Sequence, residues 1–362
     1  MKGKPGTFVI AEAGVNHNGS RDRALQLVEI AAESGADAVK FQTFRAAEVV
    51  SAKAPKAEYQ LTTTDTGESQ LEMIRKLELT EADHEALIAR ARKLDIEFLS
   101  TPFDLPSLKL LTGRFRLATI KIPSGEITNA VFLLQIARMG VRVIMSTGMS
   151  SLAEIEAALG VIAFGFTAPL EAAPHPDAFT LAYASESGQA ALREKVRLLH
   201  CTTEYPAPYA EVNLRAIETL AQAFGLPVGL SDHTSGIHIP IAAVALGASI
   251  VEKHFTVDRG LPGPDHAASI ERDELAAMVR MIRDVEIAMG DGIKRPASSE
   301  WKNRPIARKS LVAAQRIGLG EEFTTANLTC KRPGDGRSPF DYWIVLGTLA
   351  ERAYDQDDTI AP

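Results

Sequence analysis

The sequence predicts a (β/α)₈ TIM barrel followed by a small β-rich domain. Two observations support the barrel: short apolar runs alternate with helical patterns along most of the chain, and polar residues follow every run. Alternating strands and helices build parallel sheets, and eight such units within about 250 residues are typical of a closed barrel.

Eight apolar runs are interpreted as strands, and they lie at 7–11, 38–39, 96–99, 118–120, 141–145, 196–199, 227–230 and 249–251. Apolar residues at helical spacing follow most of them, at 21–34, 81–93, 130–139, 152–162, 214–224 and 239–246. The runs are nearly continuous in apolar residues, as expected of strands that are buried on both faces.

Two segments interrupt this alternation. Residues 45–78 are rich in Thr, Glu and Lys and are predicted to be a loop over one face, either a solvated excursion or a lid. Residues 163–190 are rich in Ala and Pro and are interpreted as an irregular insertion before a short helix. We therefore expect a barrel domain over 1–290, a linker over 291–305 and a compact domain over 306–362.

Composition excludes several classes of protein. The 362 residues are 46% hydrophobic and 23% charged, with a mean hydropathy of −0.01, which favours a globular chain with a full core. A net charge of −7 and a pI near 5.7 argue against a nucleic-acid partner. Cys201 and Cys330 are the only cysteines, so no disulfide framework is expected. With no apolar leader and no run near 18 apolar residues, we expect a soluble, cytoplasmic protein.

The most informative feature is the polarity of the strand ends. Parallel strands of a barrel all end at one mouth, where barrel enzymes keep their active sites. The residues expected to meet there are Glu12, Lys40, Gln42, Thr101, Lys121, Ser124, Ser146, Thr147, Thr203, Tyr205, Ser231, His233, Lys253 and His254.

His233 and His254 follow two neighbouring strands of this predicted barrel. Two imidazoles at the same end of a sheet can share a divalent metal, with carboxylates or waters in the other positions. Each histidine could instead be a hydrogen-bonded core residue, and their spacing alone is not a metal signature.

Lys40 and Lys121 come directly after apolar runs and should point into the mouth. Together with Ser124, Ser146 and Thr147 they form a plausible anion site, which the amino end of the following helix would favour. Alternatively, each lysine pairs with a barrel carboxylate such as Glu12 or Glu126. A metal beside a phosphate site would suit a phosphorylated substrate and a polarised carbonyl.

Many motifs in order resemble the sialic acid synthase family: IAEAGVNHNGS, AVKFQTF, STPFD, KIPSGE, STGM, HCTTEYPAP, GLSDHTSG, EKHFT and PGPDH. Residues 308–339 resemble the antifreeze-like (SAF) domain that ends these enzymes. The resemblance covers nearly the whole chain and implies condensation of phosphoenolpyruvate with the open-chain aldehyde of an N-acylated hexosamine. The expected acceptor is N-acetylmannosamine.

The resemblance also implies roles for individual residues. His233 and His254 would bind Mn²⁺ or Mg²⁺, and Glu12 would handle a proton or the attacking water. Gln42, Tyr205 and Asp265 would contact the sugar. The residues that would hold phosphoenolpyruvate are Lys40, Thr101, Lys121, Ser124, Ser146, Thr203 and Ser231.

The same resemblance implies a domain-swapped homodimer. The SAF domain would sit over the partner's barrel, and Arg332 would reach the acyl group of the sugar there; without the resemblance it would be read as a solvated arginine. Some members of the family carry Asn in place of Thr203, and Arg337 replaces a commonly apolar residue, so these two positions could alter the site.

Three other functions are compatible with parts of the sequence. HCTTEYPAPYAEVNL resembles the branch that makes legionaminic acid, whose acceptor is 2,4-diacetamido-2,4,6-trideoxymannose. A Schiff-base aldolase with Lys121 or Lys40 as nucleophile would need no metal and would be trapped by borohydride. A non-catalytic carbohydrate- or ice-binding protein would leave the lysines and histidines of the mouth without a purpose.

Overall fold

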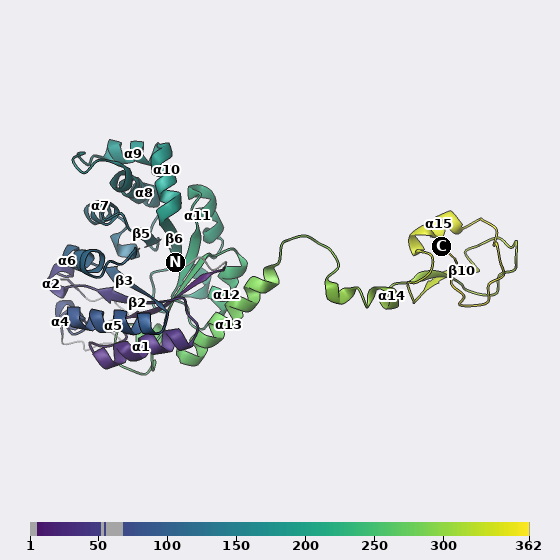
Figure 1. The fold of residues 1–362 in the computed structure, drawn as a ribbon, viewed down its shortest axis with the longest axis horizontal. Helices are drawn as coiled ribbons and strands as arrows, with labels where there is room; N and C mark the ends of the chain where they lie inside the picture. Colours follow the sequence, from purple (N-terminus) through teal and green to yellow (C-terminus); the bar gives the residue numbers. More distant parts are fainter. Residues whose placement is uncertain (1–5, 52–53, 56–67, 362) are drawn as a thin grey trace. The chain divides into compact units, whose positions relative to one another are not determined.

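A computed structural model of the chain describes residues 6–51, 54–55 and 68–361. The chain separates into two compact units, Met1–Gly290 and Asp291–Pro362. The first unit contains an eight-stranded parallel sheet surrounded by helices, and the second contains a two-stranded sheet (Figure 1).

The strands of the first unit are β1 (Phe8–Gly14), β2 (Ala38–Thr43), β3 (Glu97–Pro102), β4 (Thr119–Ile122), β5 (Arg142–Ser146), β6 (Val196–Cys201), β7 (Val228–Asp232) and β8 (Ile250–His254). Their order is β3-β2-β1-β8-β7-β6-β5-β4, and β3 also lies against β4, so the sheet closes on itself. The predicted barrel is confirmed. Ile10, Leu99, Ile144, Leu199 and Ile250 fill its interior.

Most strands continue beyond the apolar run that predicted them. β2 reaches Thr43 and β8 reaches His254, because the parallel ladder pairs Gln42 with Thr101 and Glu12 with His254. Polar residues at the carboxyl ends are therefore part of the sheet. Backbone hydrogen bonds fix their positions, which suits a site that needs fixed side chains.

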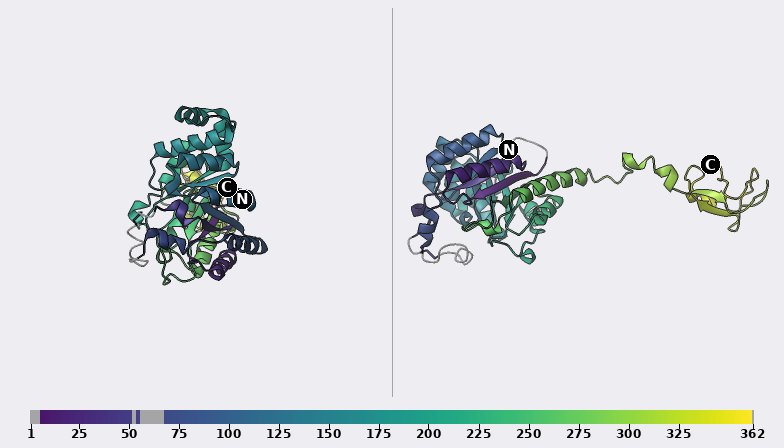
Figure 2. Two further views of the ribbon diagram at one scale, coloured as in Figure 1. Left: turned by 90° about the vertical axis from the view of Figure 1, so that its left-hand side faces the viewer. Right: turned by 90° about the horizontal axis from the view of Figure 1, so that it is seen from below.

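The helices of the first unit cover the outside of the sheet (Figure 2). They are α1 (Arg21–Glu33), α2 (Ala46–Val49), α4 (Gln70–Arg75), α5 (Glu81–Lys93), α6 (Leu105–Lys109), α7 (Ala130–Arg138), α8 (Leu152–Thr167), α9 (Pro176–Ala184), α10 (Glu186–Lys195), α11 (Ala216–Phe224), α12 (His238–Ala245) and α13 (Arg272–Met289). Capping boxes begin several of them, for example Thr80 with Asp83 at α5. Their apolar faces pack on the strands in two large clusters.

The predicted irregular insertion at 163–190 is wrong. Helix α8 runs on to Thr167, and α9 and α10 fill most of the rest. Helix α9 has no buried residue of its own, but it packs on α8, where Phe179 meets Phe164 edge to face at 5.3 Å. The weak apolar pattern of α9 explains why the sequence did not reveal it.

The segment 45–78, predicted as a loop, begins and ends in short helices. These are α2 and α4, which pack together, and α4 starts with a capping box of Ser69 and Glu72. Residues 52–53 and 56–67 of the predicted loop lie outside the described residues.

The second unit is a small domain built around β9 (Ser310–Ala313) and β10 (Leu328–Lys331), which pair antiparallel. Short helices α14 (Arg304–Ala307) and α15 (Tyr342–Val345) accompany them, and single bridges such as Ile317–Tyr354 tie its loops together. It has its own apolar core, which includes Leu311, Phe323 and Ile360. Its description as a SAF domain rests on the resemblance, and the linker predicted over 291–305 stays a prediction.

No helix in the described ranges combines the length and the apolar character that crossing a bilayer requires.

Candidate active site

A cavity of about 280 Å³ opens at the carboxyl ends of the barrel strands. Every residue to which the resemblance gave a role lines it, apart from Arg332. They are Glu12, Lys40, Gln42, Thr101, Lys121, Ser124, Ser146, Thr203, Tyr205, Ser231, His233, His254 and Asp265. Eight strand ends thus bring together residues spread over more than 250 positions of sequence, as barrel geometry predicts.

Strand alternation decides which polar side chains enter the cavity. On β8, Glu252 and His254 line it, whereas Lys253 between them points to the other face and pairs with Asp232 at 2.6 Å. On β2, Lys40 and Gln42 line the cavity in the same way. The expectation that Lys253 lies in the mouth is therefore wrong, because successive side chains of a strand point to opposite faces.

The two cavity lysines are paired with buried carboxylates. Lys40 Nζ lies 2.7 Å from Glu12 Oε2 and 3.7 Å from Glu252 Oε2, while Lys121 Nζ lies 3.5 Å from Glu252 Oε1. Hydroxyl groups complete the cluster: Lys40 donates to Thr101 at 3.1 Å, Lys121 to Ser146 at 2.7 Å, and Ser231 donates to Glu252 at 2.9 Å. The alternative of lysine–carboxylate pairing is thus met by Glu12 and Glu252 rather than Glu126, and the ammonium groups still face the cavity.

Burial makes the protonation of this cluster unusual. Burial raises the pKa of Glu12 to about 7, against the opposing effect of Lys40. Burial lowers the pKa of Lys121, although Glu252 works against the shift. For Glu252, burial alone would raise the pKa, but Lys121 and Lys40 together lower it. Near neutral pH, Glu12 can therefore both give and take a proton, while Glu252 stays ionised.

His233 is held in one tautomer by the backbone. Its Nδ1 lies 2.6 Å from the carbonyl oxygen of Thr202, and a carbonyl can only accept, so Nδ1 carries the hydrogen. The lone pair of Nε2 is then available to a ligand. The ring of Tyr205 packs against that of His233, with centroids 4.1 Å apart, and meets His254 edge to face.

His254 and Asp265 line the same cavity and lie close to each other. His254 Nδ1 is buried, lacks a hydrogen-bond partner among the described residues, and lies 3.8 Å from Asp265 Oδ2. Burial lowers the pKa of His254 well below its ordinary value, and the cations near it act in the same direction. Burial also raises the pKa of Asp265 to about 6. Gly14 has φ +51, and a side chain there would contact Glu12, His254 and Asp265.

These residues fit a divalent metal ion. The imidazole centroids of His233 and His254 are 5.4 Å apart, and the unpartnered Nδ1 of His254 marks a polar group that needs a ligand. In the described part of the chain, no three His, Cys, Asp or Glu side chains converge closely enough to hold an ion by themselves. Water or substrate oxygens would therefore complete the coordination, as in catalytic sites.

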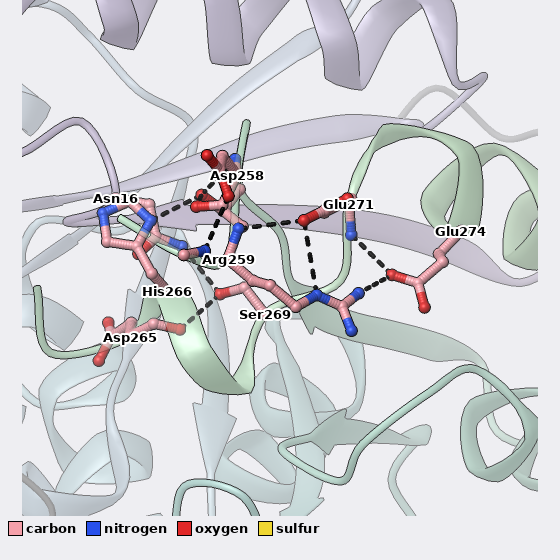
Figure 3. A network of polar contacts seen from close by, with 10 residues as sticks. Asn16, Asp258, Arg259, Asp265, His266, Ser269, Glu271 and Glu274 are labelled. Carbon is pink, nitrogen blue, oxygen red and sulfur yellow. Dashed lines mark hydrogen bonds and ion pairs between the residues drawn. The ribbon is translucent and has the colours of Figure 1, made fainter. Parts of the chain in front are cut away.

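A hydrogen-bond network fixes the loop after β8 that carries Asp265 (Figure 3). Asn16 donates to the Phe255 carbonyl at 2.8 Å and to Ser269 Oγ at 2.9 Å, and Ser269 in turn donates to the Asp265 carbonyl at 2.7 Å. Further along, Arg259 pairs with Glu271 and Glu274. These hydrogen bonds connect the loops that follow β1 and β8, next to His254 and Asp265.

Two sequence expectations do not hold at the anion site. Thr147 does not line the cavity; its hydroxyl donates to the Leu199 carbonyl at 3.0 Å. The amide of Gly148 donates to Ser124 Oγ at 2.9 Å, and α8 begins only after Ser151. The amino end of that helix therefore does not supply the site, because the polar turn after β5 is used for internal hydrogen bonds.

Arg332 belongs to the second unit, where it is exposed and its Nε donates to the carbonyl of Ala307 at 2.9 Å. Arg337 pairs with Asp341 at 3.3 Å in the same unit. The predicted contact of Arg332 with a partner's sugar stays a prediction.

Sequence reasoning missed several lining residues. Glu252 is the most important, and strand alternation relative to His254 could have identified it. Cys201 also lines the cavity, with its sulfur 3.8 Å from His233 Nδ1. Most of the others are apolar, and four of them come from the segment predicted as a loop: Val15, Phe44, Val49, Met73, Ile74, Leu77 and Phe103.

Comparison with known proteins places the chain in a family. The model of the NeuB family matches residues 27–294. An N,N'-diacetyllegionaminic acid synthase of Campylobacter jejuni is 51% identical over 98% of both chains. A synthase of the same name from Legionella pneumophila is 42% identical over 94% of this chain and 89% of its own. A crystal structure of an N-acetylneuraminic acid (sialic acid) synthetase from Leptospira borgpetersenii is 33% identical, covers 82% of this chain and 90% of its own, and has a TM-score of 0.67.

The fold and the cavity define a barrel enzyme whose site combines lysines, hydroxyls and paired histidines at the strand ends. The chain belongs to the NeuB family of nonulosonic acid synthases, which use phosphoenolpyruvate.

Proposed function

We propose that this protein condenses phosphoenolpyruvate with 2,4-diacetamido-2,4,6-trideoxymannose to give N,N'-diacetyllegionaminate and phosphate. The carrying observation is the 51% identity, over 98% of both chains, with a synthase named for that product. The N-acetylneuraminic acid synthetase of known structure is only 33% identical. The comparisons therefore favour the diacetamido acceptor over the N-acetylmannosamine expected first, which remains the second candidate.

The basic floor of the cavity would bind phosphoenolpyruvate. Lys40 and Lys121 supply positive charge, and hydroxyls surround them, so phosphate and carboxylate oxygens would find charged and neutral donors together. The hydroxyl residues assigned to this role are Thr101, Ser124, Ser146, Thr203 and Ser231. Glu252 remains ionised between the two lysines and would keep them from repelling each other when no substrate is bound.

The reaction forms a carbon–carbon bond and a carbon–oxygen bond to water, and it breaks the carbon–oxygen bond between C2 and the phosphate. The enol carbon C3 of phosphoenolpyruvate attacks the aldehyde carbon of the sugar, whose oxygen takes up a proton, and water adds to C2. The C2–O bond to the phosphate then breaks, phosphate leaves with that oxygen, and the new C2 hydroxyl loses its proton to become the ketone. Glu12 is placed to exchange the proton of this water or of the sugar oxygen, because its pKa of about 7 lets it serve as acid and base at neutral pH.

His233 and His254 would hold the divalent ion, Mn²⁺ or Mg²⁺. When bound there, the ion would supply Lewis acidity to the aldehyde oxygen. Gln42, Tyr205 and Asp265 would orient the acceptor from the cavity wall, and Tyr205 also keeps both imidazole rings in place by packing.

The proposed assembly is a domain-swapped homodimer in which Arg332 reaches the acyl group of the sugar bound in the partner's barrel. The planar guanidinium suits an amide carbonyl, and Arg332 is exposed on the second unit. A cytoplasmic location stays a prediction.

Phosphate release tests the function. The purified protein is incubated with phosphoenolpyruvate, Mn²⁺ and either the diacetamido sugar or N-acetylmannosamine, with and without EDTA. We expect release that EDTA abolishes and Mn²⁺ restores, with the diacetamido sugar preferred. Release with N-acetylmannosamine alone would assign an N-acetylneuraminate synthase. Condensation that resists EDTA and releases no phosphate, with borohydride trapping of a carbonyl substrate on Lys121 or Lys40, would support the aldolase.

A further inference from the structure

One wall of the cavity is apolar, in contrast to its charged floor. The residues of this apolar wall come from the loop after β1, from the ends of β2 and β3, and from α2, α4 and the turn after α4. They are Val15, Phe44, Val49, Met73, Ile74, Leu77 and Phe103. Apart from the weak acceptor in the Met73 thioether, their side chains carry no hydrogen-bonding group.

The wall is a packed structure. Val15, Phe44 and Leu77 form a hydrophobic cluster with Val49, Ile74 and Phe103 around them, separate from the barrel core. Phe44 and Phe103 meet edge to face with ring centroids 6.2 Å apart. Such aromatic contacts favour one fixed arrangement.

Backbone contacts hold the wall against the barrel. The amide of Ala46 donates to Glu78 at 2.6 Å, and the amide of Arg45 donates to Asp104 at 2.8 Å. The carbonyl of Lys76, just after α4, comes so close to Gly19 (φ +73) that any side chain there would clash with it at 2.3 Å. The residues just before α2 and just after α4 are therefore held in place, next to the apolar side chains of both helices.

The position of the wall identifies the part of the acceptor that meets it. The aldehyde C1 must lie near His233 and His254, and phosphoenolpyruvate must lie near Lys40 and Lys121. In an open-chain hexose, C6 is the carbon farthest from C1, so it points away from these histidines and lysines. A hydroxyl on C6 facing the wall would lose its water without finding a partner, whereas a methyl group would be buried favourably.

We infer that the apolar wall, which includes Met73 and Ile74 of α4, receives the deoxygenated C6 of the acceptor and so selects 6-deoxy over 6-hydroxy hexoses. This inference rests on the proposed function and adds the specificity-determining residues to it. It gives the described parts of the segment 45–78 that line the cavity, Val49, Met73, Ile74 and Leu77, a role in substrate selection.

The test compares two acceptors that differ in one hydroxyl, 2,4-diacetamido-2,4,6-trideoxymannose and 2,4-diacetamido-2,4-dideoxymannose. We expect kcat/KM for the 6-deoxy sugar to exceed that for the 6-hydroxy sugar by about 10- to 100-fold, the range over which an apolar pocket rejects an added hydroxyl. Both sugars retain the two acetamido groups, so the ratio of their kcat/KM values reports only the effect of the hydroxyl on C6.

Two variants should lower the ratio of kcat/KM for the 6-deoxy sugar to kcat/KM for the 6-hydroxy sugar. Met73→Gln is nearly isosteric, and Ile74→Gln places an amide in the wall; each offers a partner to a C6 hydroxyl and should lower the ratio at least about fivefold. The KM for phosphoenolpyruvate should not change. The matched control is Ile241→Gln, since Ile241 is a half-buried helical isoleucine on α12 that does not line the cavity. The control should retain the wild-type ratio.

The outcomes separate the two proposals. If both diacetamido sugars react with kcat/KM within about twofold, or if both wall variants fold and keep the wild-type ratio, the inference is overturned and the proposed function stands. If neither diacetamido sugar reacts while N-acetylmannosamine does, the proposed function is wrong, and the inference falls with it.

Discussion

Substitution of Lys253 tests whether strand alternation separates the polar residues that line the cavity from those that stabilise the fold. It is fully buried, its ammonium lies 2.6 Å from Asp232 Oδ2, and it also donates to the carbonyl of Thr234. Neither member of the pair lines the cavity. The substitution Lys253→Met keeps an unbranched side chain only one atom shorter and removes the charge.

The size of the effect follows from these contacts. At an effective dielectric constant near 20, an ion pair at 2.6 Å gains about 6 kcal/mol before the costs of desolvation. In Lys253→Met, the hydrogen bonds that remain to Asp232 among the described residues come from the amide and hydroxyl of Thr234, both 3.1 Å. Removing one partner of a buried pair costs about 3–5 kcal/mol, so we expect a loss of that size in the free energy of unfolding.

Urea denaturation followed by circular dichroism measures this loss. The double variant Asp232→Asn, Lys253→Met leaves no charge at these two positions and should recover part of the lost stability. In protein that remains folded, the KM for phosphoenolpyruvate should stay within about twofold of wild type. A Lys253→Met protein of unchanged stability with a KM raised about tenfold or more would place the ammonium in the site and refute the alternation argument.

Three further predictions concern acid–base behaviour, stability and assembly. Glu12→Gln should lower kcat by about 10²–10⁴-fold with a much smaller change in the KM for phosphoenolpyruvate; steady-state phosphate release measures both, and an unchanged kcat would remove Glu12 from proton transfer. His17 is buried, and burial, aided by His84, lowers its pKa from 6.5 to about 4, so the folded state resists its protonation. Its contribution is present above pH 6.5 and should be lost as the pH falls towards 4, on the order of 3 kcal/mol. Urea midpoints at pH 7.5 and 4.5 measure this loss, and the midpoint of His17→Asn should change less between these two pH values. An equal change in the variant would assign the acid sensitivity to other groups. Mixing Arg332→Ala with His233→Ala chains should restore about a quarter of wild-type activity if sites form in trans, because half of the reassorted dimers contain one intact site. No recovery despite subunit exchange, followed with differently tagged chains, would exclude the swapped arrangement.

Much of the barrel was predictable because its signals are local. Apolar runs such as 141–145 mark strands buried on both faces, and capping residues such as Thr80 mark where helices begin. The candidate site was predictable for the same reason: once strands are parallel, residues at their carboxyl ends must converge. His233, His254, Lys40 and Lys121 all line the cavity.

The remaining features depend on contacts between distant segments. Helix α9 has no buried side chain and is held by packing on α8, so its own residues give little helical signal. Glu252 and Lys253 are neighbours in the sequence, yet Glu252 lines the cavity, whereas Lys253 points to the other face of the sheet and pairs with Asp232.

Local patterns in the sequence establish the alternation of the eight strands with their main helices, and they imply that polar groups meet at one end of the barrel. Which of those groups enter the cavity, which of them pair as Lys40 does with Glu12, and that an apolar wall including Met73 and Ile74 completes the cavity emerge from the folded chain alone. Periodicity is a property of neighbouring residues, whereas pairing and burial depend on the register of strands and on segments that meet only after the barrel closes.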